Sequence, residues 1–142
     1  MDKLYSLQNG TDIRGVAYKD DKSDMEITLT REDVKNLVRG FATWIIYKDK
    51  KDHIKISIGT DSRLTGPDFR QACVEALTEI GVDVVDCGMA TTPAMFMSTI
   101  IDGYKCDGAI MFTASHMPYV YNGLKMFTSQ GCLEKSDLKD VI

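Results

Sequence analysis

The sequence has 142 residues, of which 44% are hydrophobic and 27% charged, a composition typical of one globular domain rather than a disordered chain. Its 17 basic and 21 acidic residues give a net charge of −4, which argues against a nucleic-acid partner because such partners need a clustered basic face. The segment MDKLYSLQNG lacks the apolar core of a signal peptide, and no apolar run approaches membrane-spanning length. The four cysteines are widely spaced and form no C-x-x-C pair, which favours free thiols over a disulfide framework or a zinc site. We expect a cytoplasmic domain that binds neither nucleic acid nor membrane.

The first half of the chain predicts a strand, a helix and a second strand. The first strand is expected at residues 12–18. Thr30 and Asp33 resemble a capping box, although Glu or Gln is the usual partner, and they begin a helix. The apolar positions of this helix follow helical spacing: Val34, Leu37, Val38, Phe41 and Ile45. The second strand is expected at residues 53–59, where every second residue from Ile54 is an isoleucine.

The second half continues the alternation of helices and strands. Pro67 is placed to open a helix that Gly81 ends, and residues 82–88 form the next strand. A short helix begins at Thr92-Pro93. Strands are expected at residues 108–112, buried on both faces, and at residues 123–128. Ser136 is expected to cap a last helix that stops after about one and a half turns, which suggests one domain of a longer protein.

This order of elements predicts the α/β class, as a three-layer α/β/α sandwich with a mixed, mainly parallel sheet over residues 1–142. The last two strands have no helix between them, so they are expected to pair antiparallel. Ligands of such sheets bind at the loops that leave the carboxyl ends of the strands. Two loops of this kind are GTDSRLTG, which follows the second strand, and TASHMPYVYNG, which follows the buried strand.

The second of these loops carries Ser115 next to His116, a pair that could belong to a hydrolase. A serine attacks only with a base to take its proton, and neighbouring side chains of an extended segment point to opposite faces. His53 lies at the amino-terminal end of its strand, away from this loop, and the chain has no G-x-S-x-G elbow. A serine hydrolase is therefore disfavoured.

Ser115 could instead carry a phosphoryl group, which needs nearby cations to balance a charge of about −2. Arg14, Arg63 and Lys125 are each expected on a strand-edge loop near a glycine, where backbone can approach a ligand closely. Any one of these residues could simply face solvent, but all three are expected beside one exposed serine.

Three segments in this order resemble the α-D-phosphohexomutase family, the phosphoglucomutases and phosphomannomutases. They are NGTDIRG (residues 9–15), GTDSRLTGP (residues 59–67) and TASHMPYVYNGLKMF (residues 113–127). The resemblance covers nearly the whole chain and is to the first of the family's four domains. It implies an enzyme that interconverts hexose 1-phosphate and hexose 6-phosphate through a bisphosphate, with glucose, mannose and glucosamine all open as the sugar.

The resemblance also implies roles for individual residues. Ser115 would be the phosphoserine and, through its phosphate, a ligand of Mg²⁺. His116 would be a polar or acid–base helper, and Lys125 and Arg14 would stabilise the transferring phosphoryl group. Glucose 1,6-bisphosphate or a similar compound would be the activator, and the phosphosugar and the remaining domains of the polypeptide would be the partners.

Contacts with the phosphate of the substrate are implied for Arg63 and for the N-G-x-K segment through Asn122 and Gly123. Two positions depart from the pattern of the family: Met117 replaces the asparagine of S-H-N-P, and Thr60 replaces the arginine of G-R-D.

The chain also lacks the D-x-D-x-D cluster of carboxylates that the family supplies from its second domain. The chain alone is therefore expected to fold without turning over substrate. A non-catalytic phosphosugar-binding or regulatory module remains the alternative.

Overall fold

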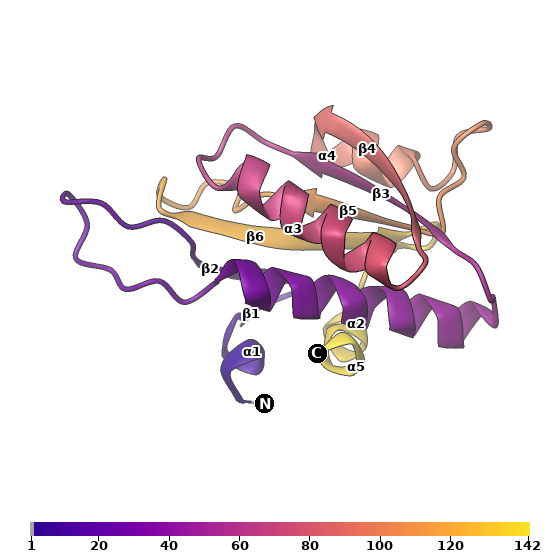
Figure 1. Ribbon diagram of the computed structural model, residues 1–142, viewed down its shortest axis with the longest axis horizontal. Coiled ribbons are helices and arrows are strands. Elements are labelled where there is room, and N and C mark those ends of the chain that lie inside the picture. The colour runs from indigo at the N-terminus through magenta and orange to yellow at the C-terminus, as the bar shows by residue number, and fades with distance from the viewer. Residues whose placement is uncertain (1) are drawn as a thin grey trace.

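A seven-stranded mixed sheet lies at the centre of the computed structural model, which describes residues 2–142, and helices cover both faces (Figure 1). The strands are β1 (Gln8–Asn9), β2 (Asp12–Val16), β3 (Lys55–Thr60), β4 (Asp83–Met89), β5 (Gly108–Phe112), β6 (Tyr121–Thr128) and β7 (Gly131–Cys132). The helices are α1 (Asp2–Ser6), α2 (Arg31–Asp49), α3 (Gly66–Glu79), α4 (Thr92–Met97) and α5 (Lys135–Val141). The predicted α/β class and the mixed sheet are confirmed.

The strand order is β1-β2-β6-β5-β3-β4, with β7 pairing to β6. Strand β3 runs parallel to β4 and β5, as expected for strands connected through helices. The pair β5–β6 is antiparallel, as predicted from the missing helix between them. The other pairings of β2 and β6 are antiparallel too, so within the described residues the sheet is less parallel than expected. The short strands β1 and β7 add antiparallel pairs, and two-residue strands leave no periodic signal in a sequence.

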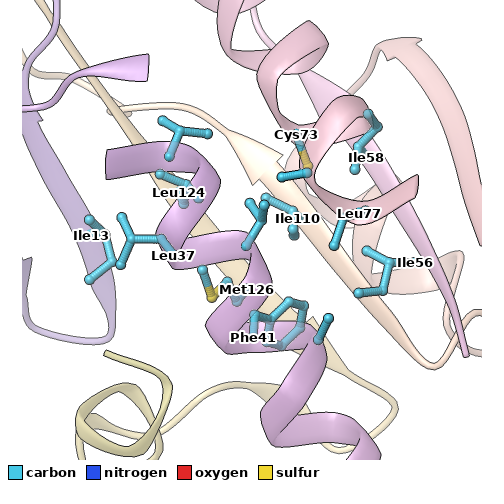
Figure 2. Close-up of a cluster of buried hydrophobic side chains, with 14 of the residues drawn as sticks. Ile13, Leu37, Phe41, Ile56, Ile58, Cys73, Leu77, Ile110, Leu124 and Met126 are labelled. Carbon is cyan, nitrogen blue, oxygen red and sulfur yellow. The ribbon is translucent and has the colours of Figure 1, made fainter. Parts of the chain in front are cut away.

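The main core lies between the sheet and the helices α2 and α3 (Figures 1 and 2). Figure 2 shows Leu37 and Phe41 of α2 beside Ile13, Leu124 and Met126 of the sheet. Cys73 and Leu77 of α3 are buried in the same cluster, which also contains Ile56, Ile58 and Ile110. The sequence pattern predicts the burial of these apolar side chains, and this burial is the main source of the stability of the fold.

Helix α4 lies on the opposite face and forms a smaller core. Met95 of α4 packs there with Ala109 and Met111 of β5 and with Phe127 of β6. Helix α4 ends at Met97, and the apolar residues Ile100 and Ile101 that follow it are more than 40% exposed. Strand β5 thus has helices over both faces, and all five of its residues are buried, as predicted.

The helix starts follow their capping signals with one exception. Thr30 and Asp33 form the predicted capping box at the start of α2, and Pro67 lies in the first turn of α3. Helix α5 is capped by Glu134, which forms a capping box with Asp137, so the prediction of Ser136 as the cap is wrong. The reciprocal bonds between Glu134 and Asp137 start the helix two residues earlier than expected. No helix within residues 2–142 has the length and apolarity needed to cross a bilayer.

Candidate functional site

Ser115 lies in a tight turn at the carboxyl end of β5. The turn spans residues 114–117 and is closed by the amide of Met117, which donates to the carbonyl of Ala114 at 3.0 Å. Ser115 has a φ of +55°, a left-handed conformation that is uncommon for a residue with a side chain. Both Ser115 and His116 are exposed. The serine is therefore presented to solvent by a strained turn rather than by an extended segment.

Two loops meet at this turn because β3 and β5 are parallel neighbours whose carboxyl ends share one edge of the sheet. Asp61 follows β3, and its carboxylate accepts a hydrogen bond from the Thr113 hydroxyl at 2.7 Å. The hydroxyl of Thr113 in turn accepts from the amide of Ser115 at 3.0 Å. Asp61 therefore fixes the Ser115 amide through one intermediate side chain.

Arg63 reaches across from the same loop, and its side chain is only 10% exposed. Its Nη1 donates to the carbonyls of Pro118 and Tyr121 at 2.9 and 3.0 Å. Its Nη2 donates to the carbonyls of Ser115 and Met117 at 2.8 and 3.0 Å. The guanidinium thus binds the backbone of the serine loop, and its predicted contact with a substrate phosphate stays a prediction.

A surface pocket of about 330 Å³ opens beside the turn. It is lined by Ser115 and by residues of both loops: Asp61, Ser62, Arg63, Leu64, Met117 and Tyr119. The Tyr119 hydroxyl donates to the carboxylate of Asp20 at 3.0 Å, which joins the loop before α2 to the rim. The lining combines polar and apolar side chains, as small-molecule sites commonly do.

Arg14 and Lys125 form a second cluster with Asp12. Asp12 accepts from Arg14 Nη2 at 2.9 Å and from Lys125 Nζ at 2.8 Å, and its side chain is only 8% exposed. Arg14 lies within β2 and Lys125 within β6, so the prediction that both lie on strand-edge loops is wrong. Sequence reasoning missed Asp12, whose proximity to Lys125 depends on the pairing of two strands far apart in the chain.

The sheet connects this cluster to the turn. Lys125 is paired with Met111 of the smaller core, so the cluster lies on the α4 side of the sheet. The Thr113 amide donates to the Gly123 carbonyl at 3.0 Å, and Gly123 is paired with Arg14. With two strand spacings of about 4.8 Å between them, the backbones of Thr113 and Arg14 lie roughly 10 Å apart. Arg14 and Lys125 are therefore near the turn, although they do not line the pocket.

Gly123 and Asn122 have packing roles that the sequence did not reveal. A Cβ on Gly123 would lie 2.1 Å from the carbonyl oxygen of Ile13 and 3.1 Å from Arg14 Cγ, so a side chain cannot fit there. Asn122 is fully buried. Its side-chain Nδ2 donates to the Thr65 hydroxyl at 2.9 Å, and its Oδ1 accepts from the backbone amide of Gly123 at 2.8 Å. A phosphate contact from either residue stays a prediction.

The two histidines lie apart. His53 precedes β3, at the opposite end of this strand from Asp61, and its ring nitrogen lies 2.7 Å from the Asp83 carboxylate. His116 follows Ser115 in the turn, and within residues 2–142 no hydrogen bond joins the two side chains. Ser115 and His116 therefore lie in a turn and not in the extended segment that the sequence predicts, and the prediction that they are not a nucleophile–base pair stays a prediction.

The described residues do not form a magnesium site by themselves. Within residues 2–142 no cluster of three or more His, Cys, Asp or Glu side chains is placed to hold a metal ion. Asp61 is the carboxylate beside Ser115, and its oxygens already accept from Thr113 and from the Arg63 amide. An ion bound through a phosphate on Ser115 would need further oxygen ligands from outside this part of the chain.

Comparison with known proteins identifies relatives for almost the whole chain. Residues 6–142 match the family described as phosphoglucomutase/phosphomannomutase, alpha/beta/alpha domain I. Phosphoglucosamine mutase of Caldicellulosiruptor saccharolyticus (strain ATCC 43494 / DSM 8903 / Tp8T 6331) is 38% identical over 132 residues, covering 92% of this chain and 26% of the relative. Phosphoglucosamine mutase of Sulfurovum sp. (strain NBC37-1) is 39% identical over 98 residues, covering 69% of this chain and 22% of the relative. The chain thus spans about a quarter of the length of the relatives it matches.

Two solved structures share the fold. A phosphoglucomutase/phosphomannomutase family protein from Burkholderia thailandensis superposes with a TM-score of 0.75 at 24% identity, covering 99% of this chain and 29% of that protein. A putative phosphomannomutase from Thermus thermophilus gives the same TM-score of 0.75 at 22% identity, covering 95% of this chain and 29% of that one. At these identities the likeness supports the fold alone.

Proposed function

The chain belongs to the phosphoglucomutase/phosphomannomutase family, as its α/β/α domain I, and on this premise we propose that it carries the phosphoserine of a hexose phosphomutase. The observation that carries the proposal is the exposed Ser115, held in a left-handed turn at the edge of the sheet where two loops meet. The roles of its neighbours follow from their positions. The whole activity belongs to the longer polypeptide, since this chain covers only 26% of a relative's length.

In the proposed reaction a hydroxyl oxygen of the hexose phosphate attacks the phosphorus of phosphorylated Ser115. A new phosphorus–oxygen bond to the sugar forms, the bond to Ser115 Oγ breaks, and the proton lost by the sugar hydroxyl ends on the serine oxygen. The resulting bisphosphate then returns its other phosphoryl group to Ser115 by the reverse of these steps. The two half-reactions together move the phosphate between the 1- and 6-positions.

The cations and His116 receive roles that suit this transfer. We assign Arg14 and Lys125 to stabilising the negative charge of the transferring phosphoryl group, the contribution that dominates this chemistry. Asp12 holds the guanidinium of Arg14 and the ammonium of Lys125 in place before substrate binds, so these two groups need to move less during the reaction. His116 is exposed beside the serine and is assigned to proton transfer. A bound Mg²⁺ would supply further charge neutralisation, with its other ligands from outside this chain.

The sugar is proposed to be glucosamine phosphate, because the relatives at 38% and 39% identity are named phosphoglucosamine mutases. Because the matching family is described as phosphoglucomutase/phosphomannomutase, glucose and mannose phosphates are the necessary comparisons in the same assay.

The test uses the complete polypeptide that contains this chain, with Mg²⁺ and a catalytic amount of hexose bisphosphate. Ser115→Ala is expected to lower the rate by about three orders of magnitude or more, because the covalent carrier is lost. Ser136→Ala, at an exposed position of α5, is the control and should keep the wild-type rate. Peptide mass spectrometry should find phosphate on the Ser115 peptide. A wild-type rate in Ser115→Ala would refute the phosphoserine mechanism. A polypeptide that binds phosphosugar without converting it would instead be a binding module.

A further inference from the structure

The guanidinium of Arg63 binds backbone carbonyls of one segment, residues 115–121, which runs from the turn to the first residue of β6. Its four hydrogen bonds, between 2.8 and 3.0 Å, go to Ser115, Met117, Pro118 and Tyr121. Its Nε lies 3.5 Å from the Asp61 carboxylate, and this atom is buried without a hydrogen bond within residues 2–142. Both terminal nitrogens are thus engaged by the loop that carries Ser115.

From this arrangement we infer that Arg63 is a positioning residue, which sets the direction of the Ser115 side chain rather than binding the substrate phosphate. The inference rests on the proposed function and deepens it, because it says how the phosphoryl carrier is aimed. Both peptide groups of Ser115 are held by the loop that follows β3. The Ser115 amide donates to the Thr113 hydroxyl, which donates to Asp61, and the Ser115 carbonyl accepts directly from Arg63.

Hydrogen bonds at both peptide groups can hold Ser115 in its left-handed conformation. A φ of +55° places a non-glycine residue in a poorly populated conformation, which persists only when the surroundings hold it. The Asp61 and Arg63 contacts supply that constraint from the carboxyl end of β3. A small rotation of this turn would move the Ser115 oxygen away from the reacting phosphorus, and displacements of about 1 Å can cost roughly 100-fold in rate.

The chemistry of the contact requires arginine. Four carbonyls converge on two nitrogens of one planar group, which lysine cannot match with a single ammonium. The bonds from the charged guanidinium to these carbonyls are charge-assisted, which makes them stronger than bonds between neutral groups. Lysine at this position would leave part of the carbonyl set unpaired in a nearly buried site.

Hydrogen–deuterium exchange tests this role independently of catalysis. In the complete polypeptide, Arg63→Lys is expected to increase exchange of the peptide covering residues 113–121 by about tenfold, the effect of weakening a charge-assisted contact. Arg63→Ala should increase it further, because all four bonds to this segment are lost. Peptides from α2 should exchange as in the wild type, which shows that the fold persists. Arg70→Lys and Arg70→Ala are the matched controls, because Arg70 pairs with Asp86 at 3.0 Å away from the turn and its side chain is 41% exposed.

Kinetics separates positioning from phosphate binding. Positioning predicts that Arg63→Lys lowers kcat by about 10- to 100-fold while KM for the sugar phosphate changes by less than about threefold. Added guanidinium ion should restore part of the kcat of Arg63→Ala. A raised KM with unchanged kcat and unchanged exchange would overturn the inference in favour of a direct phosphate contact. Should the wild-type polypeptide prove inactive, the proposed function fails, whereas the exchange measurement still decides whether Arg63 holds the turn.

Discussion

At the scale of single residues, Asp12 joins two cations that the sequence presents as separate charges. Its nearly buried carboxylate accepts from both Arg14 and Lys125. Removing the carboxylate charge leaves two cations without their shared partner, whereas removing Lys125 leaves Asp12 still paired with Arg14. The two substitutions should therefore differ in what they damage.

We expect Asp12→Asn to lower the free energy of unfolding by about 2 kcal/mol and Lys125→Met by about half of that. The order should reverse for catalysis: Lys125→Met should lower kcat by about 100-fold, because a cation facing the transferring phosphoryl group is lost. Urea unfolding and the mutase assay on the complete polypeptide measure the two effects. A Lys125→Met protein that is unstable yet fully active would assign the lysine a structural role.

The backbone of Ser115 permits a second test at this scale. Because φ is +55°, glycine relieves strain that alanine keeps, so Ser115→Gly should be more stable than Ser115→Ala by about 1 kcal/mol. The same pair of substitutions at Ser136, in α5, should show the opposite sign, since glycine is the weaker helix former. Thermal or urea unfolding measures both pairs. If glycine is the less stable variant at both positions, the turn at Ser115 is not left-handed.

At the scale of elements, the start of α2 depends on ionised Asp33. Burial alone would raise the pKa of Asp33, but hydrogen bonds from Lys3 and Thr30 outweigh it and hold the pKa below its ordinary value of 3.8. A carboxyl whose pKa is lowered by folding stabilises the protein above its ordinary pKa. That stabilisation is lost as the pH falls through the lowered value.

Asp33→Asn is therefore expected to be less stable than the wild type by about 1 kcal/mol at neutral pH, as for other losses at a helix cap. The difference should shrink on acidification below about pH 4, where the wild-type carboxyl also becomes neutral. Urea unfolding of both proteins across this pH range provides the comparison. A difference that stays constant down to about pH 2 would show that the charge of Asp33 is not what stabilises the helix.

The elements also show what the sequence could predict. The buried face of α2 and the alternating isoleucines of β3 are local patterns, and the structure confirms the helix face and the strand. The alternation predicts one buried face for β3, and this is wrong: Ser57, between the isoleucines, is buried too, because β3 lies between β4 and β5. The contacts of the site are not local: Arg63 lies 52 to 58 residues from its carbonyl partners, and Lys125 lies 113 residues from Asp12. Motif resemblance could select Arg63 as a site residue, but only the register of the sheet shows which atoms it binds.

At the scale of the whole molecule, the two ends of the described chain are held against each other. The side chain of Gln8 in β1 donates to the carbonyl of Lys135 in α5 at 3.0 Å, and Figure 1 shows α1 and α5 on the same side of the sheet. Leu138 and Val141 of α5 belong to the main core. The first and last elements therefore complete one core, which predicts that this core unfolds as a unit.

The cysteines allow this unit to be followed by chemical labelling. Cys73 of α3 is fully buried, and its burial raises the pKa of its thiol far above the ordinary range, whereas Cys132 is exposed. Because the thiolate is the reactive form, iodoacetamide at neutral pH should label Cys132 rapidly. Labelling of Cys73 should be slower by about three orders of magnitude or more, since it requires α3 to leave the sheet.

Mass spectrometry of peptides after brief labelling, across a series of urea concentrations, measures both rates. If the core unfolds as one unit, the midpoint for Cys73 should coincide with the loss of helical circular dichroism. Cys132 should react at every urea concentration, which controls for the activity of the reagent. Rapid labelling of Cys73 without urea, while the helical signal persists, would mean that α3 opens on its own. In that case the loop before α3, which carries Asp61 and Arg63, would be held less firmly than its hydrogen bonds indicate.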